Sequence, residues 1–290
     1  NKRAAEFKRS CRTRMTMEAV RRYKDVNFYI PWSFDYRGRA YPIPAFLTPQ
    51  DTDFGKSLLQ FADESEEICE KWLAFQVATS YGLDKSTMDE RLEWARSNVS
   101  LVSAVATNPI AFLHEWEAAE EPWQFLAACD EYYHCCVKLD RRTTSLPVAT
   151  DATCSGLQIL AGLARDKSTA TLVNVVPSDK PQDAYAKVAE TALSLGIPTI
   201  VHPVWDRKCV KRTVMTIPYN AKPFSNRSYI KSALCEKGVE VDKDQLTLIV
   251  ASVRKAMNLI VPGPMSVMKW IETEVSQSLK HGADHVEWTT

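Results

Sequence analysis

The stretch LPVATDATCSGLQ (residues 146–158) decides the fold of this 290-residue chain. Apolar and β-branched residues from 146 to 150 predict a buried strand, and the carboxylate of Asp151 follows at its end. Together with the backbone carbonyl of Ala152, it makes a ligand set for a hard divalent cation that also holds substrate phosphates. The alternative, on these residues alone, is an Asp that caps the following helix.

Helical spacing of apolar residues dominates on both sides of this stretch, and residues 28–44 predict an ordered loop with short strands. The chain is therefore expected to be α+β and rich in helices. Helices are predicted at 4–24, 57–62, 67–80, 86–105, 122–138, 153–165, 184–195, 203–217, 225–236, 243–260 and 264–280.

The composition is that of a soluble globular protein, with 45% hydrophobic and 25% charged residues. The eight cysteines form no C-x-x-C pair, and the N-terminus has no apolar signal region, so we expect reduced thiols inside a cell. The net charge is zero, yet nine of the first 24 residues are Lys or Arg against two Glu. Basic faces can therefore exist despite the neutral average.

The segment DYRGR (35–39) carries Arg37 and Arg39 on either side of Gly38. Arginine suits bidentate contacts to phosphate, and a glycine lets a backbone approach a ligand closely. This pattern predicts a nucleic-acid contact. The alternative is a turn held by an Asp–Arg salt bridge.

The segment DRKCVKRTVMTIPYN (206–220) predicts a helix with Arg207 and Lys211 one turn apart on the same face, and Tyr219 near its end. Two such cations with no acid between them repel each other unless an anion, such as a nucleoside triphosphate, pairs with both. The alternative is a solvated basic face.

The segment EEPWQFLAACDEYYHC (120–135) contains aromatic side chains that can stack on bases, although at helical spacing such residues belong more often to the core. The five histidines stand singly, and we assign none of them a role.

In this order and at this spacing, the chain resembles the single-subunit DNA-directed RNA polymerases of bacteriophages and mitochondria. DYRGRAYP (35–42) resembles their D-x-R-G-R element, 146–158 their motif A, and 207–219 their motif B. Similar intervening segments are EEPWQFLAAC (120–129), LVNVVPSDKPQDAY (172–185) and HVEWTT (285–290).

The resemblance implies DNA-templated RNA synthesis from ribonucleoside triphosphates by two-metal nucleotidyl transfer with Mg²⁺. It makes Asp151 and Ala152 metal ligands, and Arg207 and Lys211 contacts to the triphosphate. Lys211 would also neutralise or protonate the leaving pyrophosphate. The remaining family roles fall on Tyr219, which closes over the nucleotide and helps to select ribose, and on Arg37, Gly38 and Arg39, which contact template and hybrid.

The sugar preference follows from Gly156, the fifth residue after Asp151. Family A DNA polymerases carry a Glu there whose bulk excludes a 2′ hydroxyl, so a glycine favours ribonucleotides, with Tyr219 as a phenolic partner. Two departures from the family are Ile159 in place of a histidine and Asn220 in place of a glycine. Pro218 is also expected to kink the helix before Tyr219.

The implied architecture is a partial right-hand polymerase fold. Its expected parts are a connection from the thumb (1–25), palm (26–64 and 142–167), a helical palm insertion (65–141) and fingers (168–290). The family's motif C, a His-Asp pair that carries the second metal-binding aspartate, would lie beyond Thr290. We therefore expect a fragment that is inactive alone.

The expected partners are a DNA template, an RNA product and ribonucleoside triphosphates, with no membrane and a monomeric complete enzyme. The resemblance places the protein in the host cytoplasm if it is phage-derived, or in a mitochondrion or plastid. Two other functions remain open: a non-catalytic nucleic-acid-binding remnant of the scaffold, and a family A DNA polymerase.

Overall fold

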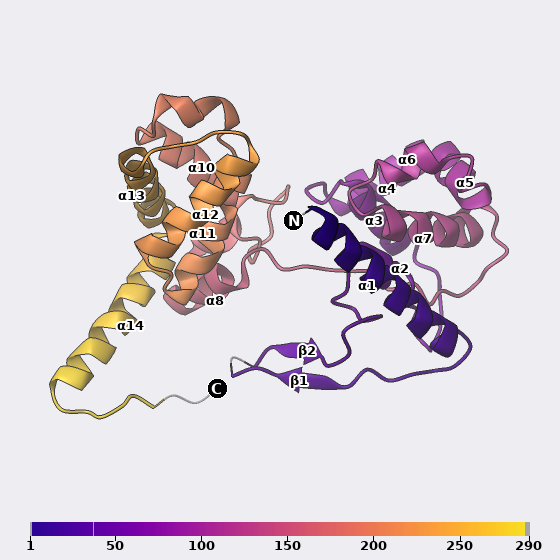
Figure 1. The fold of residues 1–290 in the computed structure, drawn as a ribbon, viewed down its shortest axis with the longest axis horizontal. Coiled ribbons are helices and arrows are strands. Elements are labelled where there is room, and N and C mark those ends of the chain that lie inside the picture. The colour runs from indigo at the N-terminus through magenta and orange to yellow at the C-terminus, as the bar shows by residue number, and fades with distance from the viewer. Residues whose placement is uncertain (1, 37, 288–290) are drawn as a thin grey trace. The chain divides into compact units, whose positions relative to one another are not determined.

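The computed structural model describes residues 2–36 and 38–287, and the chain divides into two units (Figure 1). The N-terminal unit runs from Asn1 to Thr150 and the C-terminal unit from Asp151 to Thr289. The boundary falls inside the expected second palm segment, 142–167, so the subdomain assignment stays a prediction.

The N-terminal unit contains a helical bundle and one β-hairpin. Its elements are α1 (Lys2–Tyr23), β1 (Trp32–Phe34), β2 (Ala40–Pro42), α2 (Asp53–Ser57), α3 (Glu70–Tyr81), α4 (Met88–Ser97), α5 (Val99–Thr107), α6 (Leu113–Glu117), α7 (Pro122–Tyr132) and the π-helix η1 (Tyr133–Val137). The hairpin strands are antiparallel, with Ser33 opposite Tyr41. Among the described residues this is the only sheet.

The core of the N-terminal unit lies between α3, α4, α5 and α7. Val77 of α3, Val102 of α5 and Phe125 of α7 are fully buried in it. Tyr132 is also buried, so the interpretation of the 120–135 aromatics as core is confirmed for Phe125 and Tyr132. Burial of this apolar surface is what stabilises the bundle.

A buried carboxylate attaches α1 to the loop that precedes α2. Asp51 has a fully buried side chain and accepts from Nη2 of Arg12 at 2.6 Å. It also accepts from the backbone amides of Leu47 at 2.8 Å and Thr52 at 2.7 Å. Burial alone would raise the pKa of this carboxyl, but the bonds from Arg12, Thr52 and Leu47 together hold the pKa below its ordinary value.

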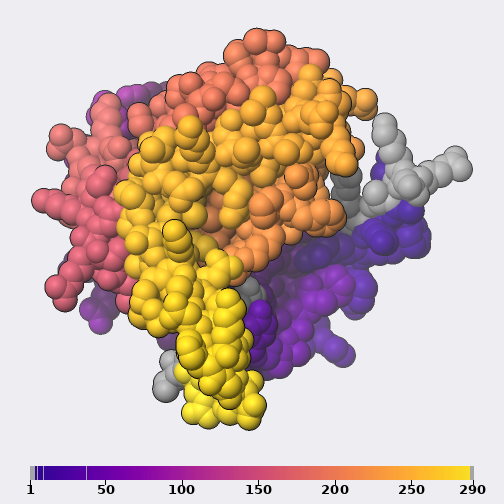
Figure 2. All heavy atoms as spheres, turned by 90° about the vertical axis from the view of Figure 1, so that its left-hand side faces the viewer, coloured from indigo at the N-terminus to yellow at the C-terminus, as the bar shows by residue number. Residues whose placement is uncertain are grey.

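The C-terminal unit is helical throughout its described part. Its elements are α8 (Ser155–Ala164), α9 (Lys167–Leu172), α10 (Ala184–Ser194), the 3₁₀ helix η2 (Thr199–Val204), α11 (Arg207–Thr216), the 3₁₀ turn η3 (Ile217–Tyr219), α12 (Pro223–Glu236), α13 (Lys243–Ile260) and α14 (Pro262–Lys280). One core joins α8, α10, α11, α12 and α13, with Leu157, Val188 and Ile249 fully buried. The far half of α14 extends from this bundle into solvent (Figures 1 and 2).

Helix prediction from the sequence is confirmed over most of the chain, including α1, α3, α8, α10 and α13. The predicted helix 86–105 is instead two helices that break at Asn98, whose side-chain amide donates to the carbonyl of Trp94 at 2.8 Å. The predicted helix 203–217 begins only at Arg207, because Asp206 caps it there.

Two predicted elements are wrong. Residues 146–150 form no strand, and residues 58–62 form no helix. The amide of Phe61 donates to the carbonyl of Ser145 at 2.9 Å, and the amide of Ala149 donates to Oε1 of Gln76 at 3.1 Å. These isolated bonds satisfy single backbone groups without forming a ladder, and a strand needs a ladder with a neighbouring strand.

Within residues 2–36 and 38–287, no single helix is both long and apolar enough to cross a membrane. Taken together, α13 and α14 are long and apolar enough, but the chain bends by 105° between the two helices.

Candidate active site

Asp151 lies in an irregular loop that leads into α8, and it is exposed. The backbone amide of Ala152 donates to its Oδ1 at 2.8 Å. The N-cap position of α8 belongs to Cys154, which is buried and takes a left-handed φ of 54°. Asp151 therefore does not cap α8, which removes the structural alternative for this residue and leaves its carboxylate facing solvent.

Gly156, in the first turn of α8, packs against the end of the motif B segment. A Cβ on Gly156 would lie 2.9 Å from Cβ of Pro218 and 3.6 Å from Cζ of Tyr219. Only a residue without a side chain allows this approach. Pro218 thus already occupies part of the space expected for a ribose hydroxyl, while Tyr219 is brought beside α8.

α11 carries Arg207 and Lys211, and its N-terminus is fixed by Asp206. Oδ1 of Asp206 accepts from the amides of Lys208 at 2.9 Å and Cys209 at 3.3 Å, and its Oδ2 accepts from Nζ of Lys237 at 2.6 Å. Burial opposes ionisation of this carboxyl, but the contact with Lys237 and the amide bonds hold its pKa below the ordinary value.

The two cations of α11 have different surroundings. Arg207 is partly buried, and its Nε lies 2.7 Å from Oδ2 of Asp183, the N-cap residue of α10. Lys211 is exposed and makes no ion pair with the described part of the chain. No acid lies between the two cations in the sequence, but Asp183 pairs with Arg207 from another helix, which the local pattern does not reveal.

Pro218 ends α11 and does not merely kink it. The helix stops at Thr216, and residues 217–219 form the 3₁₀ turn η3, followed by Asn220 with a left-handed φ of 62°. Tyr219 is half exposed at this turn. The position of Tyr219 is set by the turn and by the packing of Pro218 on Gly156.

The DYRGR segment forms the turn of the β1–β2 hairpin in the N-terminal unit. The amide of Asp35 donates to the carbonyl of Arg39 at 3.0 Å, and Oδ1 of Asp35 accepts from the amide of Arg39 at 3.1 Å. Gly38 has φ 75°, which explains the glycine. Arg39 is exposed, and Arg37 lies outside the described residues. The geometry supports the turn, and the nucleic-acid contact stays a prediction.

The Asp151 loop offers hard oxygen donors for Mg²⁺, namely one carboxylate and the neighbouring carbonyl of Ala152. Among residues 2–36 and 38–287, no three His, Cys, Asp or Glu side chains lie together as a metal-binding group. The loop therefore fits an ion that takes one carboxylate and completes its shell with water and substrate phosphate.

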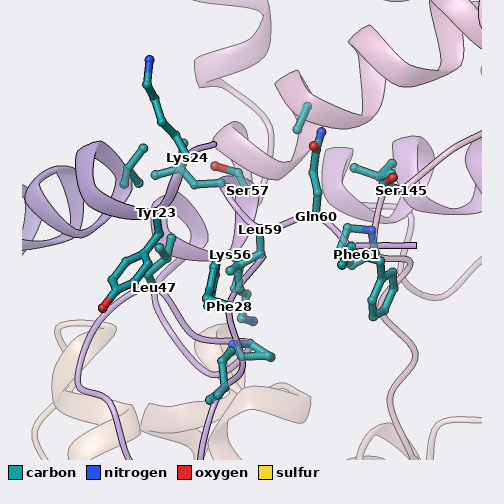
Figure 3. A pocket seen from close by; sticks show the side chains of 18 of the residues that line it. Tyr23, Lys24, Phe28, Leu47, Lys56, Ser57, Leu59, Gln60, Phe61 and Ser145 are labelled. Atoms are coloured by element: carbon teal, nitrogen blue, oxygen red, sulfur yellow. The ribbon is translucent and has the colours of Figure 1, made fainter. Parts of the chain in front are cut away.

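A pocket of about 900 Å³ opens in the N-terminal unit, among the end of α1, the end of α2 with the segment 58–62 that follows it, and residues 145–149 (Figure 3). Tyr23, Phe28, Leu47 and Phe61 give it apolar walls, and Lys24 lies at its margin (Figure 3). None of the predicted site residues that the structure describes lines it.

The predicted site residues thus fall into two groups. Asp151, Ala152, Gly156, Arg207, Lys211 and Tyr219 belong to the C-terminal unit, where α8 and η3 are in contact. Gly38 and Arg39 belong to the N-terminal unit.

Comparison with known proteins identifies the family of this chain. A family model described as DNA-dependent RNA polymerase matches residues 64–289. The chain belongs to this polymerase family, of the phage and mitochondrial type.

Named relatives are similar over nearly the whole chain. The mitochondrial DNA-directed RNA polymerase of Neurospora crassa is 31% identical over 93% of this chain, which corresponds to 20% of the relative. The human mitochondrial enzyme is 30% identical over 92% of the chain and 23% of its own length. Chloroplastic DNA-directed RNA polymerase 3 of Nicotiana sylvestris is 30% identical over 97% of this chain, which corresponds to 31% of the relative. The chain thus spans about a fifth to a third of these polymerases.

The structure explains what the two departures from the family pattern, at positions 220 and 159, do to the local geometry. Asn220 adopts the left-handed conformation that glycine favours, and Asn tolerates it better than most residues, so the exchange preserves the turn. Ile159 is 65% exposed on α8 and supplies no polar group where the family has a histidine. The side-chain amide of the preceding residue, Gln158, donates to the carbonyl of Val173 at 2.8 Å.

Asp183 and Tyr185 lie beside Arg207 in the candidate site, and sequence reasoning missed both. The sequence predicted a turn at 177–183 and a helix at 184–195. The only local signal at Asp183 was its position at the start of that helix, which says nothing about Arg207. Their proximity to Arg207 arises from the packing of α10 against α11.

Proposed function

We propose that the complete protein carrying this chain synthesises RNA on a DNA template by nucleotidyl transfer from ribonucleoside triphosphates. The observation that carries this proposal is the contact of Gly156 with Pro218 and Tyr219, which joins the metal-ligand loop to the basic helix. Family membership supports it. Positioning and charge stabilisation, rather than covalent catalysis, would supply the rate.

In this proposal, Asp151 and the carbonyl of Ala152 hold Mg²⁺ against the substrate phosphates. Bound Mg²⁺ would neutralise phosphate charge and promote ionisation of the attacking 3′ hydroxyl. Arg207 and Lys211 bind the triphosphate from α11, and Lys211, exposed at the surface of the unit, neutralises or protonates the departing pyrophosphate. A second metal would need ligands from outside the described residues.

The ribose preference is assigned to Tyr219 together with Gly156. Tyr219 presents its phenol beside α8, where a hydroxyl can hydrogen-bond a 2′ hydroxyl. Gly156 contributes by letting Pro218 and Tyr219 approach α8, because a larger residue at this position would push them away.

The proposed partners are a DNA template and an RNA product, contacted by Arg37 and Arg39 at the hairpin turn. The complete enzyme is proposed to be monomeric. The named relatives are mitochondrial and chloroplastic, which favours an organelle over a phage-infected cytoplasm for this protein. Because the described residues provide one carboxylate ligand, the 290-residue chain alone is proposed to be inactive.

The test is Asp151→Asn in the complete polymerase, assayed for primer or transcript extension and, separately, for template binding. The expected result is loss of extension by roughly a thousandfold or more with unchanged template affinity, because the metal ligand is lost and the nucleic-acid contacts are not. Asp244→Asn, in the exposed first turn of α13, is the matched control. Extension by the Asp151 variant at the control's rate would refute the proposal. Salt-dependent DNA binding without any extension in the parent protein would favour a non-catalytic scaffold.

A further inference from the structure

The carboxylate of Asp183 serves two helices at once. Its Oδ1 accepts from the amides of Tyr185 at 3.0 Å and Ala186 at 3.1 Å, which fixes it to the start of α10. Its Oδ2 lies 2.7 Å from Nε of Arg207 on α11, and both side chains are largely shielded, with 22% and 28% of their surface exposed. Because the amides hold one oxygen, the other is a fixed anion beside the guanidinium.

The ring of Tyr185 bounds the same guanidinium from a second side. The centre of the Arg207 guanidinium lies 5.5 Å from the ring centroid, within range of a cation–π contact. Tyr185 is buried in the same core cluster as Cys154, the N-cap residue of α8, and its hydroxyl lies near that thiol. Burial raises the pKa of this hydroxyl, so it stays neutral. The ring is therefore held by the segment that follows Asp151.

These contacts leave much of the guanidinium available. The Asp183 contact is an ion pair without a hydrogen bond from Nε, and Arg207 donates no hydrogen bond to the described residues. An arginine has several further N–H donors at the fork of its guanidinium. Lys211, one turn along α11, is exposed and makes no ion pair with the described residues. An anion on this face can meet both cations.

We propose that Asp183 is a positioning residue that orients Arg207 toward the triphosphate of the incoming nucleotide. This inference rests on the proposed function and deepens it. Asp183 would also reduce the repulsion between Arg207 and Lys211 before the nucleotide arrives, so that the binding face is formed in advance. Its loss should weaken nucleotide binding more than it slows the chemical step.

The test is Asp183→Asn in the complete polymerase, with KM and kcat measured for nucleotide incorporation. An asparagine has one oxygen where the aspartate has two, so either the helix cap or the contact with Arg207 is lost, and the charge is lost in both cases. The expected result is a KM for nucleotide raised roughly fivefold or more, with kcat changed less than about twofold. In an Arg207→Ala background, the same change should raise KM no further, because Asp183 acts through Arg207.

Asp242→Asn is the control, because Asp242 also caps a helix through Oδ1, that of α13, which carries none of the predicted site residues. It should lower the melting temperature by a similar amount without the rise in KM. A merely structural role for Asp183 would instead make the two variants alike in both measurements, which would overturn the inference.

The outcomes separate the inference from the proposed function. If Arg207→Ala raises KM and Asp183→Asn does not, the positioning role fails and the proposed function stands. If Asp183→Asn raises KM equally with and without Arg207, the positioning role also fails. If the parent polymerase incorporates no nucleotide, the proposed function itself fails.

Discussion

At the scale of single residues, the contact between Gly156 and Pro218 is the feature that joins the two sequence motifs. A proline ring cannot move aside as a flexible side chain can, so a Cβ placed 2.9 Å from it must displace η3 or α8. Glycine at this position therefore has a structural role that exists whether or not a nucleotide is bound.

Replacing Gly156 by alanine should destabilise the C-terminal unit by about 1–2 kcal/mol, because overpacking outweighs the gain in helix propensity. Urea unfolding of the 290-residue chain measures this. Gly162→Ala is the matched control in the same helix, since a Cβ there meets nothing within 4 Å, and it should stabilise by about 0.5–1 kcal/mol. If both variants gained stability alike, the packing of Pro218 on Gly156 would be disproved.

At the scale of elements, the attachment of α1 involves an ion pair between Arg12, which is 44% exposed, and the fully buried Asp51. Arg12 reaches Asp51, which in turn holds the backbone at Leu47 and Thr52. Most described side chains of α1 are exposed, although Thr16 is buried. The loop before α2 and the basic helix are thus ordered by the same carboxylate.

Asp51→Asn should lower the free energy of unfolding of the N-terminal unit by about 2–3 kcal/mol at neutral pH. Because the folded pKa of Asp51 lies below its unfolded value, its stabilisation is fully present above that unfolded pKa, about 4, and is lost as pH falls through the folded pKa. The difference between parent and variant should therefore shrink on acidification, as chemical unfolding at several pH values would reveal.

Asp89→Asn is the control that tests whether removal of any ion-paired acid causes the same pH-dependent loss of stability. Asp89 pairs with Lys71 at 3.0 Å, but both side chains are more than half exposed. Its replacement should change stability by less than about 0.5 kcal/mol at any pH. If the Asp51 variant were as stable as this control, the conclusion that Asp51 attaches α1 to the loop before α2 would be wrong.

At the scale of the whole molecule, the chain has two hydrophobic cores that share no residue. One contains Phe125 and lies between residues 73 and 135, and the other contains Ile249 and lies between 154 and 261. Each core stabilises its own unit, so the units should unfold as separate cooperative transitions.

Phe125→Ala should lower the free energy of unfolding of the N-terminal unit by about 3–5 kcal/mol, because it leaves a cavity in that core. For the same reason, Ile249→Ala should lower the free energy of unfolding of the C-terminal unit by about 2–5 kcal/mol. Differential scanning calorimetry of the 290-residue chain distinguishes them. A single transition that both variants shift equally would mean that the units are energetically coupled.

The sequence by itself determined most of the helices and the order of the motifs. The 18-residue run of α13, begun by a capping box at Asp242, and the left-handed Gly82 that ends α3 are local signals, so they can be read from neighbouring residues. The left-handed turn at Gly38 is equally local. The positions of Asp151, Arg207, Lys211 and Tyr219 along the chain needed no tertiary information either.

Only the tertiary structure decided which groups meet. Residues 146–150 have the composition of a strand, but a strand exists only with a partner ladder, and none lies beside them in the described residues. The pairing of Asp183 with Arg207, and of Gly156 with Pro218, depends on how helices distant in sequence pack. Local preference and periodicity fix the conformation of a segment, whereas the environment of a charge is fixed by the other segments that surround it.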